Sequence, residues 1–84
     1  MNTTVWEQIV LGARTNSVVR IIYTKVNGDT LTYYIEPYSV RDDKYLFGFN
    51  REKNHIEKYI MSNISDAEVT DQTFTPRWEV EITE

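Results

Sequence analysis

The sequence predicts a mainly β domain with one N-terminal helix, in which five short strands form a small, strongly bent antiparallel barrel. Three observations support this fold class. Apolar residues recur at helical spacing near the start, the period changes to two from Val18, and turn-forming residues follow at short intervals. The 84 residues suffice for a single domain, residues 1–84, with the helix at about 4–14, the barrel at about 18–74 and a further strand or tail at 76–84.

The first element is a helix that begins near Val5. The stretch Thr4-Val5-Trp6-Glu7 fits a capping box, in which the Thr4 hydroxyl accepts a hydrogen bond from a backbone N–H group of the first turn. Gly12 weakens the last turn, and a helix this short needs a sheet to pack on. Four apolar residues form the stripe that would face this sheet: Trp6, Ile9, Val10 and Ala13.

A hairpin follows the helix. Its first strand places Val19, Ile21 and Tyr23 on one face. Asn27-Gly28 predicts a type I′ turn, because both central residues of that turn need positive φ. The return strand, Thr30 to Glu36, would end at Pro37, which has no N–H group to donate to a ladder.

Three further strands are expected after this hairpin, at Lys44–Asn50, His55–Met61 and Ala67–Phe74. A turn at Arg41-Asp42-Asp43 precedes the first of them, and residues 62–66 form a break with room for one helical turn. Gly48 indicates a bend or a close approach of two backbones.

The end of the chain alternates cleanly, with Trp78, Val80 and Ile82 on one side of residues 77–84. An amphipathic stretch this regular is expected to dock rather than to hang free. It either adds a strand to its own sheet or pairs with the sheet edge of another copy.

The charge, the cysteine content and the apolar runs of the chain disfavour several classes of function. The formal net charge is −4, and residues 64–84 carry six acids against Arg77, a balance of −5, so the rest of the chain is close to neutral. Such a charge disfavours non-specific polyanion binding, which depends on Lys and Arg. The chain has no cysteine, and its early apolar run, residues 9–11, is too short for a signal peptide or a membrane span, so we expect a cytoplasmic protein.

No catalytic or metal-binding constellation is visible. His55 is the only histidine, and no serine or cysteine motif accompanies it, so it reads as an exposed strand residue. Asp42-Asp43 lacks the further oxygen ligands of a cation site and reads as a turn. We therefore expect no enzyme activity, no cofactor and no metal.

The aromatic residues of the third strand leave two interpretations open. Tyr45, Phe47 and Phe49 share one face, and Leu46 lies on the other. If the aromatic face is exposed, it forms a stacking platform beside nearby basic residues, as in single-strand binders. Alternatively, the helix or the C-terminal tail covers it, which is favoured because a small domain needs its aromatics buried.

The order of these features resembles the WYL domain from about Trp6 to Phe74. The residues that carry the resemblance are Ala13, Tyr23, Ile35, Pro37, Tyr45-Leu46, Gly48, Tyr59, Met61 and Ile64. The resemblance implies an Sm-like or SH3-like barrel. It also implies a bacterial or phage regulatory module that binds a ligand, often a nucleic-acid fragment, and signals to an attached DNA-binding domain.

The sequence departs from the family pattern at several positions. Lys44 replaces the tryptophan, and Ser62 replaces an aspartate. Tyr33, Glu57 and Asn63 stand where arginines are common, so much of the basis for an anionic ligand is missing.

The prediction is a non-enzymatic regulatory module that senses a ligand, either single-stranded nucleic acid or a small anion. The alternative is a module for protein–protein interaction or self-assembly through Trp78–Glu84, with no small ligand. The predicted ligand-binding residues are Lys44, Tyr45, Phe47, Arg51, Lys53, His55 and Lys58, with Arg20 adjacent.

Overall fold

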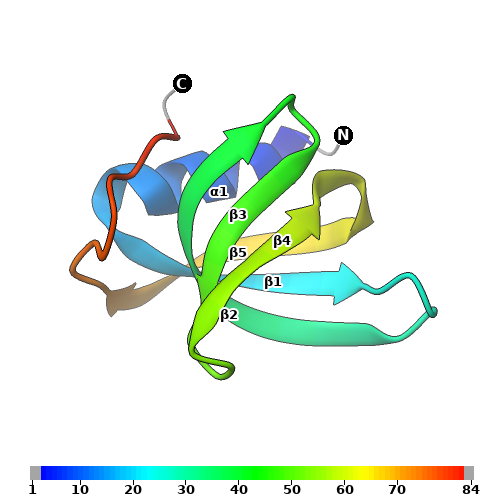
Figure 1. Ribbon diagram of the computed structural model, residues 1–84. Coiled ribbons are helices and arrows are strands. Elements are labelled where there is room, and N and C mark those ends of the chain that lie inside the picture. The colour runs from blue at the N-terminus through cyan, green and yellow to red at the C-terminus, as the bar shows by residue number, and fades with distance from the viewer. Residues whose placement is uncertain (1–2, 83–84) are drawn as a thin grey trace.

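The computed structural model describes residues 3–82 and contains one α-helix, one short 3₁₀ helix and five strands (Figure 1). The helix agrees with the prediction to within one residue at each end. No helix of the described part of the chain is long and apolar enough to cross a membrane. The elements are α1 (Thr3–Thr15), β1 (Ser17–Thr24), β2 (Thr30–Arg41), β3 (Tyr45–Asn50), β4 (His55–Ile60), η1 (Met61–Asn63) and β5 (Ile64–Thr73).

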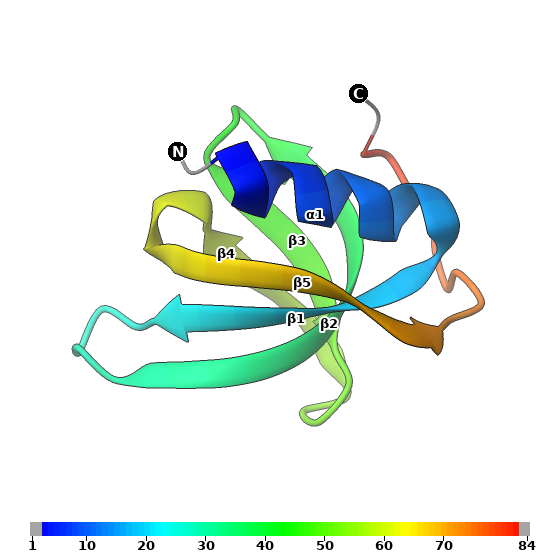
Figure 2. The same cartoon turned by 180° about the vertical axis from the view of Figure 1, so that it is seen from behind.

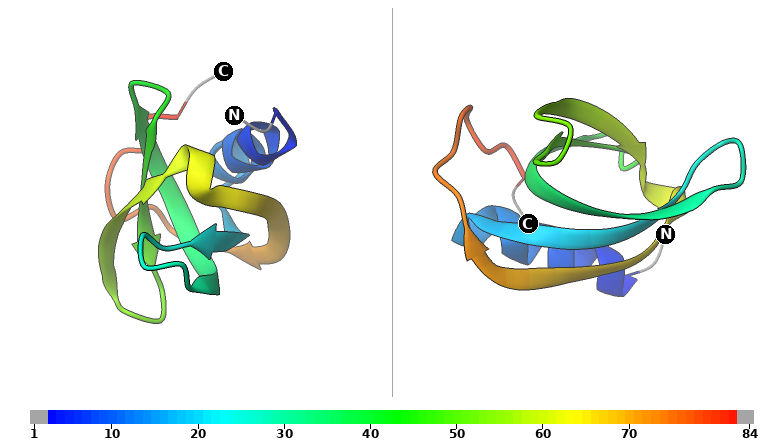
Figure 3. Two further views of the ribbon diagram at one scale, coloured as in Figure 1. Left: turned by 90° about the vertical axis from the view of Figure 1, so that its right-hand side faces the viewer. Right: turned by 90° about the horizontal axis from the view of Figure 1, so that it is seen from below.

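The five strands form one antiparallel sheet in the order β4-β3-β2-β1-β5. The predicted closed barrel is wrong, because β4 and β5 are the two edges of this sheet and no strand pairing joins them among residues 3–82. The strong bend is confirmed. The long strand β2 pairs with β1 up to Ile35 and with β3 from Ile35 onward, so the sheet curls about its middle strand (Figure 3).

Pro37 does not end β2, contrary to the prediction. The strand continues to Arg41, and Pro37 lies opposite Gly48 of β3 beside a register shift. The ladder with β1 has already ended at Ile35, so the missing N–H group interrupts no pairing on that side. Gly48 permits the close approach: a Cβ atom there would lie 3.0 Å from Ile35 Cδ1.

The hairpin turn at Asn27-Gly28 differs from the predicted type. At Asn27-Gly28 only Gly28 has positive φ, at 96°, and its N–H group donates to the Lys25 carbonyl at 2.9 Å. This is a type I turn followed by a left-handed glycine, not type I′. Type I′ geometry occurs instead at Asp42-Asp43, where φ is 57° and 53° and Lys44 N–H donates to the Arg41 carbonyl.

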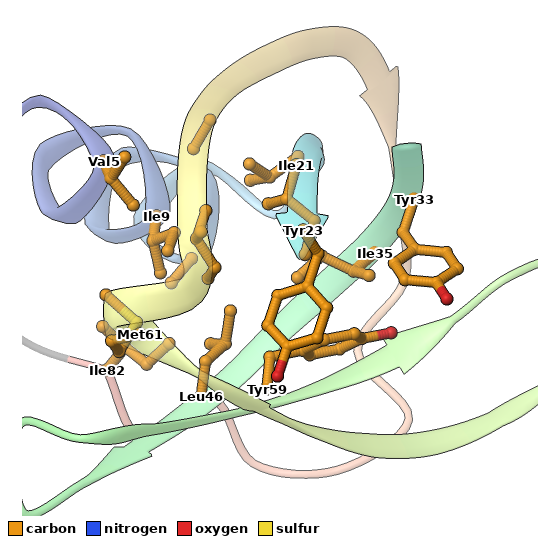
Figure 4. Close-up of a cluster of buried hydrophobic side chains, with 14 of the residues drawn as sticks. Val5, Ile9, Ile21, Tyr23, Tyr33, Ile35, Leu46, Tyr59, Met61 and Ile82 are labelled. Atoms are coloured by element: carbon orange, nitrogen blue, oxygen red, sulfur yellow. The ribbon is translucent and has the colours of Figure 1, made fainter. Parts of the chain in front are cut away.

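The inner face of the sheet and α1 enclose the main core (Figures 2 and 4). The predicted helix stripe is confirmed for Ile9, Val10 and Ala13, whereas Trp6 is only partly buried. Thr4 lies one residue inside the N-terminal bound of α1. The strands contribute inward residues that alternate as expected: Val19, Ile21, Tyr23, Tyr33, Ile35, Leu46 and Tyr59.

At both edges of the sheet, a side-chain oxygen accepts a hydrogen bond from a backbone N–H group of the edge strand. The hydroxyl of Tyr23 accepts the N–H group of Ile60 on β4 at 3.0 Å. On β5, the N–H group of Val69 donates to the Gln8 side chain of α1 at 2.8 Å. Each edge is thereby partly blocked against pairing with another chain.

The C-terminal segment, residues 74–82, forms no strand. The prediction for residues 76–84 was a further strand or a tail, and over residues 76–82 the chain is a tail; residues 83 and 84 lie outside the described part. It still docks on its own sheet, as the alternation suggested. Glu81 N–H donates to the Tyr38 carbonyl at 2.7 Å, and Ile82 is buried in the main core. Figure 1 shows the segment leaving β5 and turning back along one side of the molecule.

Candidate functional site

The outer face of β2, β3 and β4 carries the aromatic row of β3. Leu46 points into the main core, so Tyr45, Phe47 and Phe49 face outward. Phe49 is buried by the C-terminal segment in a second core, whereas Tyr45 and Phe47 are half-buried. The covered interpretation is therefore confirmed for Phe49 only.

A buried carboxylate attaches the C-terminal segment to this face. Glu36 is 1% exposed, and its oxygens accept hydrogen bonds from Arg77 Nε at 3.1 Å and Nη2 at 3.4 Å. The Arg77 guanidinium also lies 4.1 Å from the centroid of the Phe49 ring. A buried charge needs such partners, because it has lost its hydration.

Tyr38 completes the attachment. Its hydroxyl donates to Glu36 Oε1 at 2.7 Å and accepts the N–H group of Arg77 at 3.0 Å. Burial raises the pKa of Tyr38 to about 12, with the Arg77 N–H bond opposing and the Glu36 carboxylate adding to the shift. The ring packs edge-on against Trp78, with 5.4 Å between centroids.

An open groove of about 510 Å³ lies between the outer face and the C-terminal segment. Its volume falls within the range of small-ligand sites. Arg41 is paired with Glu81 at 3.1 Å across it. The residues that line it are Tyr38, Ser39, Arg41, Phe47, Ile56, Trp78, Glu79 and Glu81.

Five of the predicted site residues lie on or beside this face, and Tyr45 is one of them. Phe47 lines the groove, and Lys58 pairs with it across the strands but places Nζ 4.8 Å from the centroid of the Tyr45 ring. Lys44 lies at the same corner, since its carbonyl accepts the N–H group of Met61. Arg51 lies at the far end, with Nε 3.8 Å from Glu36.

Lys53 and His55 belong to a separate cluster around Glu57. Lys53 Nζ lies 3.2 Å and His55 Nε2 3.8 Å from the Glu57 carboxylate. The hydrogen bond to Glu57 raises the pKa of Lys53. Lys53 also lies over the ring of Tyr33, an inner-face residue, so this cluster is not part of the groove.

Arg20 does not join the other predicted residues. It pairs with Asp66 at 3.0 Å and with Glu68 at 3.2 Å, both on β5 at the other end of the sheet. Hydrogen bonds to these carboxylates raise its pKa. Across residues 3–82, no cluster of His, Asp and Glu side chains could hold a metal ion.

Most of the groove was not predicted as a site. Arg41 and Glu79 look like ordinary solvated charges in the sequence, and nothing there marks Glu36 as buried. The alternation of Trp78, Val80 and Ile82 was the one signal that the segment docks, but it does not say on which face.

The fold defines a class of protein: a five-stranded, open antiparallel sheet whose inner face is packed by one helix. The chain belongs to the WYL domain family, whose model matches residues 4–69. WYL domains are generally regulatory sensing modules. The C-terminal segment lies beyond the matched residues, so one wall of the groove is supplied from outside the family match.

A solved structure shares the fold. The chain is similar to proteasome accessory factor B/C (PafBC) of Arthrobacter aurescens, with a TM-score of 0.75 and 18% sequence identity. The similarity covers 88% of this chain and 13% of PafBC. No protein with curated annotation matches the sequence.

Proposed function

We propose that this chain is a non-enzymatic regulatory binding module that recognises its ligand in the groove on the outer face of β2, β3 and β4. The observation that carries the proposal is the groove itself. It combines aromatic and aliphatic walls, from Phe47, Trp78 and Ile56, with a small number of charged groups. That combination is typical of binding sites, and membership of the WYL family supports a regulatory role for it.

A second candidate is recognition of single-stranded nucleic acid or a small anion at the corner formed by Lys44, Tyr45 and Lys58. Neither lysine has an ion pair within residues 3–82, and the half-buried Tyr45 ring carries the Lys58 ammonium, which a stacking base would have to displace. Arg20, Arg51 and Lys53 support this candidate less, because carboxylates already lie beside them. Self-assembly by strand pairing has less support as well, since residues 78–82 are folded onto their own sheet.

The test is an NMR titration of the ¹⁵N-labelled chain with two probes, a mixed-sequence single-stranded DNA hexanucleotide and a capped Gly-Arg-Gly tripeptide. We expect amide shifts from at least one probe to cluster on residues 38–47, 56–60 and 78–81. Shifts confined to α1 and β5, or a silent spectrum with both probes, would overturn the proposal.

A further inference from the structure

The rings of the β3 aromatic row differ in what covers them. Lys58 Nζ lies over Tyr45, and the Arg77 guanidinium lies over Phe49, at 4.8 Å and 4.1 Å from the ring centroids. Phe47 lies between these two rings on the strand, and no cation of residues 3–82 covers it. This face therefore binds cations on two neighbouring rings and leaves the middle ring open to the groove.

The groove around Phe47 is acidic. It contains one arginine, Arg41, against two glutamates, Glu79 and Glu81, and Arg41 is already paired with Glu81. Glu79 is exposed and has no ion pair within the described residues. Among the lining residues the free charge is thus negative, which favours a cation and opposes a phosphate. Lys58 lies opposite Phe47 across the strands, but it does not line the groove and its Nζ lies over the Tyr45 ring.

Trp78 supplies a second aromatic wall. Its side chain is about half exposed, and its ring is held edge-on to Tyr38 and tilted against Phe49. Phe47 and Trp78 both line the groove, so a flat cation bound there has two aromatic side chains in its walls. Aromatic faces attract guanidinium groups more often than ammonium groups, because the planar group also stacks.

From these observations, and resting on the proposed function, we infer that the groove binds an arginine side chain from a basic peptide segment of a partner protein. The guanidinium lies against Phe47 and pairs with Glu79. A peptide fits better than a small molecule because the groove is open rather than enclosed and, at about 510 Å³, has room for residues that flank the arginine. The Arg77 guanidinium on Phe49, paired with a glutamate, is the same contact made within the chain.

The test uses Trp78 as the reporter. In a Trp6→Phe background Trp78 is the only tryptophan, so its fluorescence follows occupation of the groove. The probe is the capped Gly-Arg-Gly tripeptide, and its control is the same peptide with citrulline, which keeps the shape and removes the charge. We expect saturable binding of the arginine peptide and at least about tenfold weaker binding of the citrulline peptide.

Two variants locate the contact. Glu79→Gln is expected to weaken binding roughly three- to fivefold, and Phe47→Leu roughly three- to tenfold. Glu52→Gln removes one exposed carboxylate from the β3–β4 turn, outside the groove, and should leave binding unchanged. Equal binding of both peptides, or equal effects of Glu79→Gln and Glu52→Gln, would overturn the inference.

The DNA probe separates this inference from the proposed function. If the hexanucleotide shifts the outer-face amides and the arginine peptide does not bind, the inference is wrong and the proposed function stands. If neither probe binds, both are wrong. Phe47 is half-buried, so Phe47→Leu can disturb the fold as well as the contact. Glu79 is exposed, so Glu79→Gln should fold normally and tests the contact independently.

Discussion

At the scale of single residues, Glu36 is the carboxylate on which the attachment of the C-terminal segment depends. It is buried and lies beside Arg77, Tyr38 and Arg51. Removing one partner of a buried charge is more destabilising than removing a surface pair, because the remaining charge stays out of water. Arg77 thus contributes to both the stability of the fold and the position of the groove wall.

Arg77→Gln is expected to lower the free energy of unfolding by roughly 1 to 3 kcal/mol, because Glu36 is left with Arg51 at 3.8 Å as its remaining cation. Urea unfolding measures the change. The matched control is Arg41→Gln, whose partner Glu81 is half exposed, and it should cost less than about 1 kcal/mol. Equal losses in the two variants would contradict the role given to Glu36.

Tyr38 makes stability depend on pH in the alkaline range. Its pKa is raised from 10.0 to about 12 in the folded state, mainly by burial, so the neutral phenol is favoured by folding. This stabilisation is complete below the unfolded pKa and is lost as the pH rises from about 10 to about 12. Urea unfolding on both sides of pH 10 should show the loss, and Tyr38→Phe should reduce the slope; an unchanged slope would be evidence against it.

The site was predictable only in part at this scale. The sequence placed Tyr45, Phe47 and Lys58 near one another, because alternation along neighbouring strands fixes which residues share a face. It did not predict that Lys53 and His55 gather around Glu57 or that Arg20 pairs with β5. Those contacts depend on strand order and register, which local patterns do not specify.

At the scale of elements, Gly12 sets how closely α1 approaches the sheet. A Cβ atom at this position would overlap Cγ2 of Val19 and lie 3.2 Å from the Ser17 carbonyl oxygen. The glycine that weakens the helix by propensity is therefore required by packing.

Gly12→Ala is expected to destabilise the fold by roughly 1 to 2 kcal/mol, although alanine alone favours the helix by about 1 kcal/mol. The measurement is the urea unfolding midpoint. Leu11→Ala, at a neighbouring exposed position, should cost less than about 1 kcal/mol. A stabilised Gly12→Ala variant would show that the contact with Val19 relaxes freely.

For two of the three hairpin turns within residues 3–82, those at Asn27-Gly28 and Asp42-Asp43, substitution by glycine is expected to change stability in opposite directions. Asp43 has positive φ, so Asp43→Gly should be neutral or stabilise by up to about 1 kcal/mol. Asn27 has no positive φ, and its side chain accepts the Asp29 N–H group at 3.0 Å, so Asn27→Gly should destabilise by roughly 0.5 to 1 kcal/mol. Thermal unfolding of the two variants tests the assignment, and equal signs would refute it.

The elements themselves were largely predictable. The helix stripe, the five strands and a short helical break follow from apolar periodicity and turn residues. The break is shorter than predicted, because β5 begins at Ile64 and not at Ala67. The end of β2 was not predictable, because a proline normally ends a strand. Only the structure shows that β1 no longer pairs with β2 beyond Ile35, so Pro37 can lie within the strand. The C-terminal stretch alternates like a strand, yet it is attached through the side chains of Arg77 and Ile82 and one backbone bond to Tyr38.

At the scale of the whole molecule, the two faces of the bent sheet differ in what they contribute. The inner face packs the core, and the outer face carries the groove. The inner face and α1 hold the main core, while the outer face of β2, β3 and β4 is covered at one end by the C-terminal segment and hollowed beside it. Two of the six acids of residues 64–84, Glu79 and Glu81, line the groove, whereas Asp66 and Glu68 pair with Arg20 at the other end of the sheet. The sequence indicates the number of strands but not whether the two edge strands, β4 and β5, pair with each other. The prediction of a barrel was therefore wrong.

The most direct measurement is an isotope-filtered NOE spectrum of the labelled chain with the unlabelled capped Gly-Arg-Gly peptide. The account predicts contacts from the arginine δ-methylene protons to the ring of Phe47 and the indole of Trp78. Contacts to α1, or to the ring of Tyr45 in place of Phe47, would contradict it.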